Sequence, residues 1–164
     1  MNIKSITFTG MPSNYSVINK TVSRSAQPLK NDFAWLKSQG VTDVINFRTM
    51  HVKAVDFDEQ EVVEKLGMKY HNIPSITMYP KEESVRTFLD IMEGIEKSGG
   101  KAHIHCKAGA DRTGMYAYIY KALKGLGDNC GNHLEAINMG HDYKRYPDLI
   151  SWANRMVEKI KIGK

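Results

Sequence analysis

The chain has 164 residues, a net charge of +5 from 23 Lys and Arg against 18 Asp and Glu, 41% hydrophobic residues and two cysteines. This length fits a single domain over residues 1–164, which buries enough surface to fold without a structural metal or disulfide bonds. The charged fraction of 25% excludes collagen-like and disordered chains, and two cysteines are too few for a disulfide framework.

Helical and extended patterns alternate along the chain. Apolar periodicity and capping residues predict helices from Asn31 or Asp32 to about Gly40, over 56–66, 84–96, 115–123 and 149–160, and a short helix that opens at Asn132-His-Leu-Glu135. β-Branched and apolar runs predict strands over 42–47, 68–73 and 102–105.

This alternation indicates an α/β fold with a short, mainly parallel sheet flanked by helices. In such sheets ligands bind beyond the carboxyl ends of the strands. The residues that follow Phe47, Ile73 and His105 are therefore the places to look for a site.

The strand that ends at His105 is followed by the loop Cys106-Lys-Ala-Gly-Ala-Asp-Arg112, and then by the helix that Thr113-Gly114 opens. A strand, a loop of small residues and a helix N-terminus form an anion-binding concavity, because successive backbone N–H groups point at one centre. Ala108, Gly109 and Ala110 keep bulky side chains out of it, and the forked guanidinium of Arg112 suits two phosphate oxygens. We call residues 106–112 the anion loop.

Cys106 lies at the mouth of the anion loop. The converging amides, the helix dipole and Arg112 all favour its thiolate form, which is the nucleophilic one. The hydroxyl of Thr113 is placed to donate a hydrogen bond to the sulfur, and His105 is placed to support the loop through hydrogen bonds to backbone groups.

These residues match the signature His-Cys-x5-Arg-Ser/Thr at six positions: His105, Cys106, Gly109, Arg112, Thr113 and Gly114. The sequence resembles the cysteine-dependent protein tyrosine phosphatase superfamily, and most of all its small dual-specificity branch. Two upstream segments, Ser23-Arg-Ser-Ala-Gln-Pro28 and Val44-Ile-Asn-Phe-Arg48, resemble compact bacterial and fungal members. The resemblance covers roughly residues 20–125.

The resemblance implies a two-step phosphatase of the protein tyrosine phosphatase-like fold that needs no metal and no cofactor. Cys106 attacks phosphorus to give a cysteinyl-phosphate, which water then hydrolyses. The amides of Lys107 to Arg112, with the Arg112 side chain, bind the equatorial phosphate oxygens. His103, His105 and Cys106 together raise a metal site as an alternative, but metal ligation would consume the nucleophile, which favours a supporting role for the histidines.

The general acid departs from the family pattern. Related proteins commonly place an aspartate in the loop after the strand that matches 68–73, whereas residues 74–83 contain none here. We favour Asp111, because some relatives carry an aspartate before the signature arginine and this role has been proposed there. Glu82 or Glu83 is the alternative acid, although both also suit the N-terminus of the predicted helix over 84–96. Without an acid, activity would be weak.

The substrate class has three interpretations. The leading one is a protein tyrosine or dual-specificity phosphatase, whose partner is a phosphorylated protein. The alternative is a phosphoinositide or inositol-phosphate phosphatase acting on a small phosphorylated substrate, because Lys107 beside the nucleophile resembles the loop of tensin-type enzymes. Those relatives carry a second basic residue where this chain has Ala110 and Asp111, and Lys107 also suits a solvated rim position. The third is a catalytically weak phospho-binding module.

The positive charge is spread from Lys4 to Lys164 without forming a tract, which favours a phosphorylated partner over nucleic acid. No segment approaches the roughly 20 apolar residues that cross a bilayer, and the N-terminus lacks a signal-peptide pattern. We therefore expect a cytoplasmic protein with no stable membrane insertion. The oligomeric state has no sequence signal.

Three further residues have alternative interpretations. Arg48 and His51 follow the end of a predicted strand and are placed to line the rim of the site, although Arg48 equally suits a structural ion pair. Cys130 lies in a segment rich in Gly and Asn, which predicts a loop, and is either a free thiol or a redox partner of Cys106. A cysteine nucleophile must stay reduced, which supports a reducing compartment.

Overall fold

A five-stranded sheet forms the centre of the computed structural model, which describes residues 10–49 and 54–163. Its strands are β1 (Ser16–Val17), β2 (Val22–Ser25), β3 (Asp43–Asn46), β4 (Lys69–Asn72) and β5 (Ala102–His105). They lie in the order β1-β2-β5-β3-β4, and all neighbours are parallel except β1 and β2. The predicted α/β fold with a mainly parallel sheet is thus confirmed.

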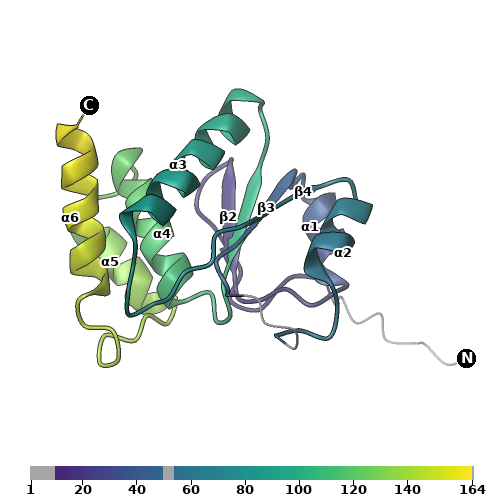
Figure 1. Cartoon of the computed structure of the whole chain (residues 1–164), viewed down its shortest axis with the longest axis horizontal. Coiled ribbons are helices and arrows are strands. Elements are labelled where there is room, and N and C mark those ends of the chain that lie inside the picture. Colours follow the sequence, from purple (N-terminus) through teal and green to yellow (C-terminus); the bar gives the residue numbers. More distant parts are fainter. Residues whose placement is uncertain (1–9, 50–53, 164) are drawn as a thin grey trace, which may run out of the picture.

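Helices cover both faces of this sheet (Figure 1). They are α1 (Asp32–Ser38), α2 (Glu59–Lys65), α3 (Glu82–Lys97), α4 (Asp111–Leu123), α5 (Asn129–Asn138) and α6 (Leu149–Ile162). The first two helices lie on one side of the sheet, and α3 to α6 lie on the other. Each layer has its own apolar core, a small one around Phe33 and Leu36 and a larger one around Phe88 and Tyr116.

The central helix α4 is buried on nearly all sides because it packs between the sheet, α5 and α6. Its residues from Thr113 to Tyr120 are all buried, as expected for a helix that is apolar all round. Asp111 occupies its first turn, so the anion loop leads directly from the end of β5 into this fixed helix.

The helices predicted over 84–96 and 115–123 begin earlier than predicted, at Glu82 and Asp111. In two further cases the predicted start is wrong because an aspartate other than the predicted residue is the cap. The helix predicted over 56–66 begins at Glu59, because Asp58 accepts a hydrogen bond from the N–H of Glu61 at 3.1 Å. The helix predicted to open at Asn132 begins at Asn129, because Asp128 caps it. Cys130 therefore lies in the first turn of α5 instead of a loop.

The sequence patterns missed β1 and β2, although β2 lies between β1 and β5 in the sheet. The reason is that β2 reads Val-Ser-Arg-Ser, which has one apolar residue and no alternation. Its polar side chains are buried nonetheless, because Ser23 and Ser25 each form a hydrogen bond with the ring of His103 on β5. Specific polar pairing takes the place of apolar contact in this strand.

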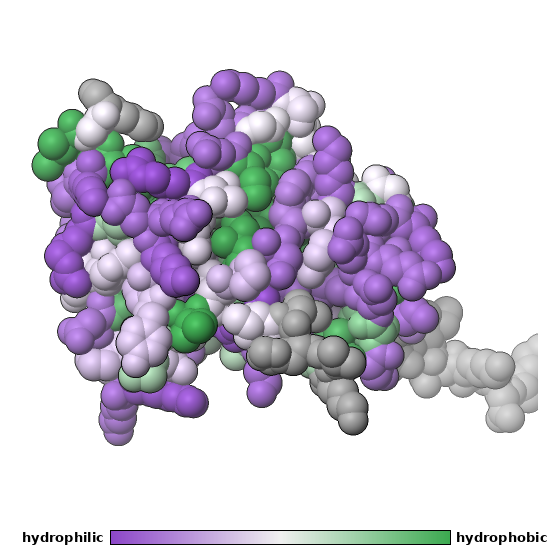
Figure 2. Space-filling view, in the orientation of Figure 1, coloured by the Kyte–Doolittle hydropathy of each residue, from purple (hydrophilic) through white to green (hydrophobic). Residues whose placement is uncertain are grey.

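Hydrophilic residues cover most of the face seen in Figure 2, interrupted by an apolar region beside α3. Among the helices of residues 10–49 and 54–163, none is both long and apolar enough to cross a membrane.

Candidate active site

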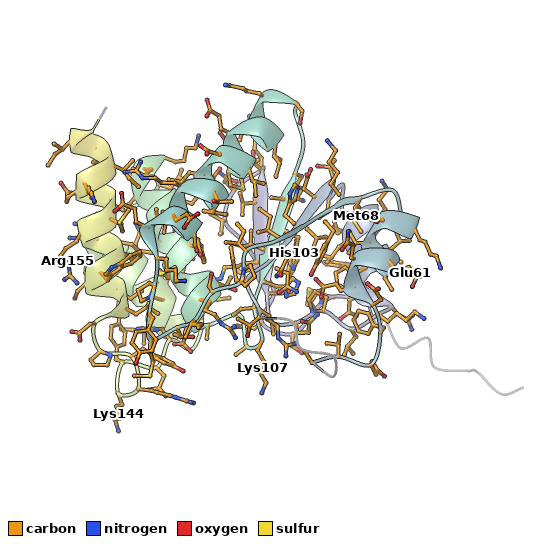
Figure 3. The ribbon with its side chains drawn as sticks, viewed as in Figure 1. Glu61, Met68, His103, Lys107, Lys144 and Arg155 are labelled. Atoms are coloured by element: carbon orange, nitrogen blue, oxygen red, sulfur yellow. The ribbon has the colours of Figure 1, made fainter. Side chains whose placement is uncertain are left out.

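The site lies at the carboxyl ends of the parallel strands, where the anion loop joins β5 to α4. This loop brings the predicted residues Cys106, Asp111, Arg112 and Thr113 together, and Cys106 is 2% exposed. Lys107 and Ala108 are exposed, whereas Gly109 and Ala110 are buried. Lys107 projects from the lower edge of the molecule in Figure 3.

The backbone carbonyls of the anion loop are held from outside by an earlier part of the chain. Three successive carbonyls accept hydrogen bonds from residues 14–27. The pairs are Gln27 N–H to Lys107 O at 2.9 Å, Asn14 Nδ2 to Ala108 O at 3.1 Å, and Arg24 Nη2 to Gly109 O at 2.8 Å. A loop whose carbonyls point outward presents its N–H groups to the opposite, inner side.

The N–H groups on that inner side are free to bind an anion. Within the described part of the chain, the backbone N–H groups of residues 107–112 donate no hydrogen bond to another residue. They stand at the N-terminus of α4, where the helix dipole adds further positive potential. Converging amides with fixed carbonyls are the arrangement that binds a phosphate or another tetrahedral oxyanion.

Gly109 is the tightest point of this arrangement. Its φ of +71° lies in the left-handed region, and a Cβ there would stand 2.4 Å from the carbonyl carbon of Ser25. No side chain fits at that distance, so only glycine lets the anion loop rest directly on β2.

Arg24 is a buried cation behind the anion loop. It is 1% exposed, and besides Gly109 it contacts Oε1 of Glu135 at 3.3 Å, while Lys121 binds the other oxygen of the same carboxylate. Burial lowers the pKa of Arg24, and the charges of Glu135 and Cys106 act in the opposite direction. The guanidinium is therefore electrostatically attracted to a Cys106 thiolate.

His105 supports the loop as the sequence predicts. Its Nδ1 donates to the carbonyl of Cys106 at 3.1 Å, and its Nε2 lies 2.8 Å from Oε2 of Glu59. Both side chains of the pair are completely or nearly completely buried, and Gln27 donates to the other oxygen of Glu59 at 2.6 Å. The first residue of α2 is thereby tied to the backbone of Cys106.

His103 belongs to the interior of the sheet. Ser25 Oγ donates to the carbonyl of Ala26 and lies 2.7 Å from Nε2 of His103, while Ser23 Oγ lies 2.9 Å from Nδ1. Burial lowers the pKa of His103 well below its ordinary value, so the ring is neutral. Both ring nitrogens are used in these bonds, which favours the supporting role over the metal alternative.

Arg112 reaches across the mouth of the loop to the segment that follows β4. Its Nη1 donates to the carbonyl of Ser75 at 3.3 Å. Ser75 is itself fixed, because its hydroxyl lies 2.7 Å from the Tyr116 hydroxyl and its N–H donates to the carbonyl of Phe47 at 3.1 Å. The signature arginine is thus oriented by a loop from another strand.

Thr113 is fully buried, and its hydroxyl has no hydrogen-bond partner among the described residues. A buried hydroxyl without a partner is costly and calls for an explanation. The sequence predicts a hydrogen bond from this hydroxyl to the sulfur of Cys106. The structure does not form this bond, although Thr113 lies on α4 one residue after Arg112.

Asp111 is held by the segment that joins α5 to α6. Its Oδ1 accepts hydrogen bonds from Nδ1 of His141 at 2.7 Å and from the N–H of Asp142 at 2.9 Å. Burial alone would raise the pKa of Asp111, but these two hydrogen bonds and the charges of His141 and Arg112 outweigh it, so the pKa is lowered. Oδ2 accepts no hydrogen bond from the residues that the structure describes.

The alternative acids are placed differently. Glu82 binds Arg86 at 2.8 Å and Lys159 at 2.6 Å on the surface, and hydrogen bonds from these two cations lower its pKa. Glu83 is exposed in the first turn of α3. Neither carboxylate contacts the anion loop within the described residues.

Arg48 Nη1 donates to Oε1 of Gln27 at 2.8 Å, so Arg48 joins the hydrogen-bond network that supports the anion loop. Among the described residues it forms no ion pair. His51 lies outside the described residues. Cys106 is buried and Cys130 is exposed, and both are free thiols.

Sequence reasoning missed the residues that hold the loop from a distance: Asn14, Arg24, Gln27, Glu59 and His141. They contact residues that are distant in the sequence: His141 and Asp111 are 30 positions apart, and Asn14 and Met139 are 125 positions apart. Arg24 and Gln27 do belong to the segment Ser23–Pro28, whose resemblance to other proteins was the available signal.

The comparisons with known proteins agree with this geometry. The family model described as a DSP-PTPase phosphatase fused to NAD+ kinase matches residues 9–140. Among curated protein sequences, none matches the chain significantly.

Solved structures of similar fold cover nearly the whole chain. A candidate phosphatase of the DUF442 family from Shewanella putrefaciens CN-32 is 27% identical, with a TM-score of 0.77 over 97% of this chain and 98% of that one. TpbA from P. aeruginosa is 20% identical, with a TM-score of 0.75 over 92% and 90%, and it has also been solved in complex with phosphotyrosine. The core catalytic domain of the PP-IP phosphatase SIW14 from S. cerevisiae is 15% identical, with a TM-score of 0.67 over 88% and 94%.

Proposed function

The chain belongs to this DSP-PTPase family, a small dual-specificity-like branch of the cysteine-dependent protein tyrosine phosphatases, and we propose that it hydrolyses phosphotyrosine, and phosphoserine or phosphothreonine, in proteins. The observation that carries the proposal is the anion loop, in which residues 14–27 fix the carbonyls while the N–H groups of residues 107–112 remain free around Cys106.

In the first step, Sγ of Cys106 attacks phosphorus and forms the S–P bond as the P–O bond to the leaving oxygen breaks. The amides of the anion loop and the guanidinium of Arg112 stabilise the equatorial oxygens, on which charge redistributes in the transition state. The leaving oxygen takes a proton from the general acid.

In the second step, water attacks the cysteinyl-phosphate, and the S–P bond breaks to release inorganic phosphate. The base that takes a proton from this water is the carboxylate left by the first step, so the acid is restored. The Thr113 hydroxyl and the positive charge of Arg24 both favour the departing thiolate.

Asp111 is the general acid in this proposal. It is the carboxylate nearest in the chain to Arg112, and Oδ1 is held by His141 while Oδ2 remains available for a proton. Glu82 is less suitable, because Arg86 and Lys159 hold it on the surface. Because the pKa of Asp111 is lowered, its protonated form is populated only in more acidic solution than that of an ordinary aspartate, which favours turnover at acidic pH.

Two observations bear on the substrate. TpbA, which shares the fold, binds phosphotyrosine in a crystal, and this supports a phosphoprotein substrate here. Lys107 is exposed beside the nucleophile, where an added cation suits a polyphosphorylated headgroup, and SIW14 is named as a PP-IP phosphatase. An inositol phosphate is therefore the second candidate. Membership of a phosphatase family favours either over a binding module.

The test is a panel of substrates under reducing conditions: phosphotyrosine and phosphoserine or phosphothreonine peptides, inositol phosphates, and NADP+, since the matched family is described as fused to NAD+ kinase. We expect the highest kcat/KM on phosphotyrosine peptides and no turnover by Cys106→Ser. A preference for inositol phosphates would replace the leading candidate with the second one, and activity that survives in Cys106→Ser would contradict the mechanism.

A second prediction tests the acid. Asp111→Asn should lower kcat by about 10²-fold on phosphoserine peptides, whose alkoxide leaves poorly, and by much less on an aryl phosphate with an acidic phenol. Glu82→Gln is the matched control and should leave both rates unchanged. Equal losses on the two substrates would mean that Asp111 only supports the loop.

A further inference from the structure

Two loops contact the anion loop, one through Arg112 and the other through Asp111. Loop 74–81 connects β4 to α3, and loop 139–148 connects α5 to α6. Their far ends and the start of α6 enclose a hollow of about 180 Å³, which we call the outer hollow. Its lining includes Met78, Arg145, Tyr146, Asp148, Trp152 and Arg155.

The outer hollow lies a short distance from the reaction centre. Loop 74–81 is anchored where Arg112 binds the carbonyl of Ser75, and Met78 follows three positions later. Since consecutive Cα atoms are about 3.8 Å apart, Met78 lies within about 11 Å of that anchor along the chain.

Loop 139–148 is also hydrogen-bonded to the anion loop. The N–H of Asp142 binds Asp111, and Arg145 again follows three positions later. This turn is compact, because Oδ1 of Asp142 accepts hydrogen bonds from the N–H groups of Lys144 at 3.1 Å and Arg145 at 3.0 Å. Lys107 of the anion loop and Lys144 of this second loop both project from the lower edge of the molecule (Figure 3), so the anion loop and loop 139–148 open on the same side.

The chemistry of the outer hollow combines positive charge with apolar walls. Arg145 and Arg155 form no ion pair with a carboxylate in the described part of the chain, and the guanidinium carbon of Arg145 lies 5.4 Å from the centre of the Tyr146 ring. Asp148 contributes one opposing charge and makes no side-chain cap for α6. Two guanidiniums against one carboxylate favour an anionic group, and Met78 and Trp152 suit an aliphatic stem.

We propose that the outer hollow binds an acidic side chain of the substrate, a glutamate about three residues from the phosphorylated residue. An extended peptide advances about 3.3 Å per residue, so three residues span about 10 Å, which lies within the limit of about 11 Å that loop 74–81 sets. The glutamate stem would lie against the apolar wall while its carboxylate meets Arg145 and Arg155. This assignment rests on the proposed phosphatase function and specifies the peptides that the site would prefer.

The experiment compares phosphotyrosine peptides that carry Glu or Gln three positions before or after the phosphotyrosine. Their Kd values are measured on Cys106→Ser, which binds without turnover, and their kcat/KM values on the wild-type protein. We expect the better-placed Glu peptide to bind about tenfold more tightly than its Gln counterpart, which is about 1.4 kcal/mol. Arg145→Gln with Arg155→Gln should reduce this ratio to about one.

The matched control is Lys144→Gln with Lys161→Gln, which removes two exposed charges from the same loop and the same helix outside the hollow. It should keep the tenfold ratio. The proposal is overturned if wild-type protein treats Glu and Gln peptides alike, or if the control loses the ratio as well. It is also overturned if the two arginine substitutions weaken only inositol phosphates.

Failure of the proposed function gives a different result. In that case the wild-type protein would not turn over any phosphotyrosine peptide or aryl phosphate, whatever the binding ratio. A binding ratio that persists on Cys106→Ser would still support the outer hollow as an acidic-peptide subsite.

Discussion

The two sides of the anion loop are held in different ways. Its outward-facing carbonyls are fixed by donors from residues 14–27 at distances of 2.8–3.1 Å, of which Arg24 is buried, Gln27 half-buried and Asn14 exposed. The rim of the site is formed by exposed loops, where Ile76, Met78 and Tyr79 are 55%, 64% and 70% exposed. We therefore expect turnover to depend on the side held by residues 14–27, which we call the buried side because Arg24 and Gly109 lie in it. This side tolerates little change, whereas the rim can vary and so suits substrate selection.

The strongest challenge to the buried side is Gly109→Ala. We expect the free energy of unfolding to fall by about 2–4 kcal/mol and turnover to be lost, because the added Cβ meets the backbone of Ser25 and the residue must keep a positive φ. Thermal unfolding and aryl phosphate turnover measure the two effects. Gly99→Ala is the control, since Gly99 has the same φ of +71° with nothing within 4 Å. It should cost about 1 kcal/mol and keep activity.

The next prediction separates the charge of Arg24 from its support of the fold. Arg24→Met should lower kcat/KM by about 10²-fold and destabilise the protein by about 1–3 kcal/mol, because the carbonyl of Gly109 loses its donor and Glu135 keeps only Lys121 as a partner. Arg24→Met with Glu135→Leu should recover part of the stability but not the activity, since it removes the carboxylate that lost its partner but leaves Gly109 without its donor. Recovery of both would show that Arg24 acts only through stability.

A second readout follows the nucleophile itself. If the charge of Arg24 favours the Cys106 thiolate, alkylation of Cys106 by iodoacetamide at pH 6 should be several-fold slower in the stabilised double variant than in wild-type protein. Equal alkylation rates would contradict an electrostatic role.

The smallest expected effect concerns His141, which lies on a rim loop and binds Asp111 of the anion loop. His141→Gln keeps a donor for Asp111 but removes the ring and its charge, so the pKa of Asp111 should rise towards its ordinary value. A proposed acid with a higher pKa stays protonated to higher pH, so the alkaline limb of the kcat profile on phosphoserine peptides should move upward by less than about one pH unit. His71→Gln, which also loses a carboxylate partner, should leave the profile unchanged.

The same shift has a consequence for stability. Because the folded-state pKa of Asp111 is lowered, its carboxylate stabilises the protein above the ordinary carboxyl range, and this contribution is lost as pH falls through the lowered value. Unfolding of His141→Gln should therefore differ from wild type at pH 7 and converge with it in strongly acidic solution. A constant difference at all pH values would point to lost packing instead.

The sequence predicted the structural features that depend on contacts between residues close together in the chain. It did not predict the features that depend on contacts between distant residues. The local pattern from Ala102 to Gly114 sufficed to predict the strand, the loop and the fold class, although α4 begins at Asp111, four residues before the predicted start. β2 was missed because its serines pair with His103, about 80 positions away. A single chain gives no local sign of such pairs.

The candidate site shows the same limit. Cys106, Arg112 and Thr113 follow from the motif, and their catalytic roles stay predictions. The identity of Asn14 or His141 could not be inferred, because each matters only through the partner that the fold brings to it. The start of α2 was misplaced for a local reason, since Asp56 and Asp58 are both plausible caps and only Asp58 is used.

The place of β2 in the sheet also orders events during folding. β2 pairs with β5, whose residues follow it by about 80 positions, so this part of the sheet closes a long loop of chain. Closing such a loop is slow compared with forming local helices, and a ribosome must first release most of the chain. The donors at Asn14, Arg24 and Gln27 reach the anion loop only once that closure is complete, so a nascent chain completes its anion loop at the end of folding and not before.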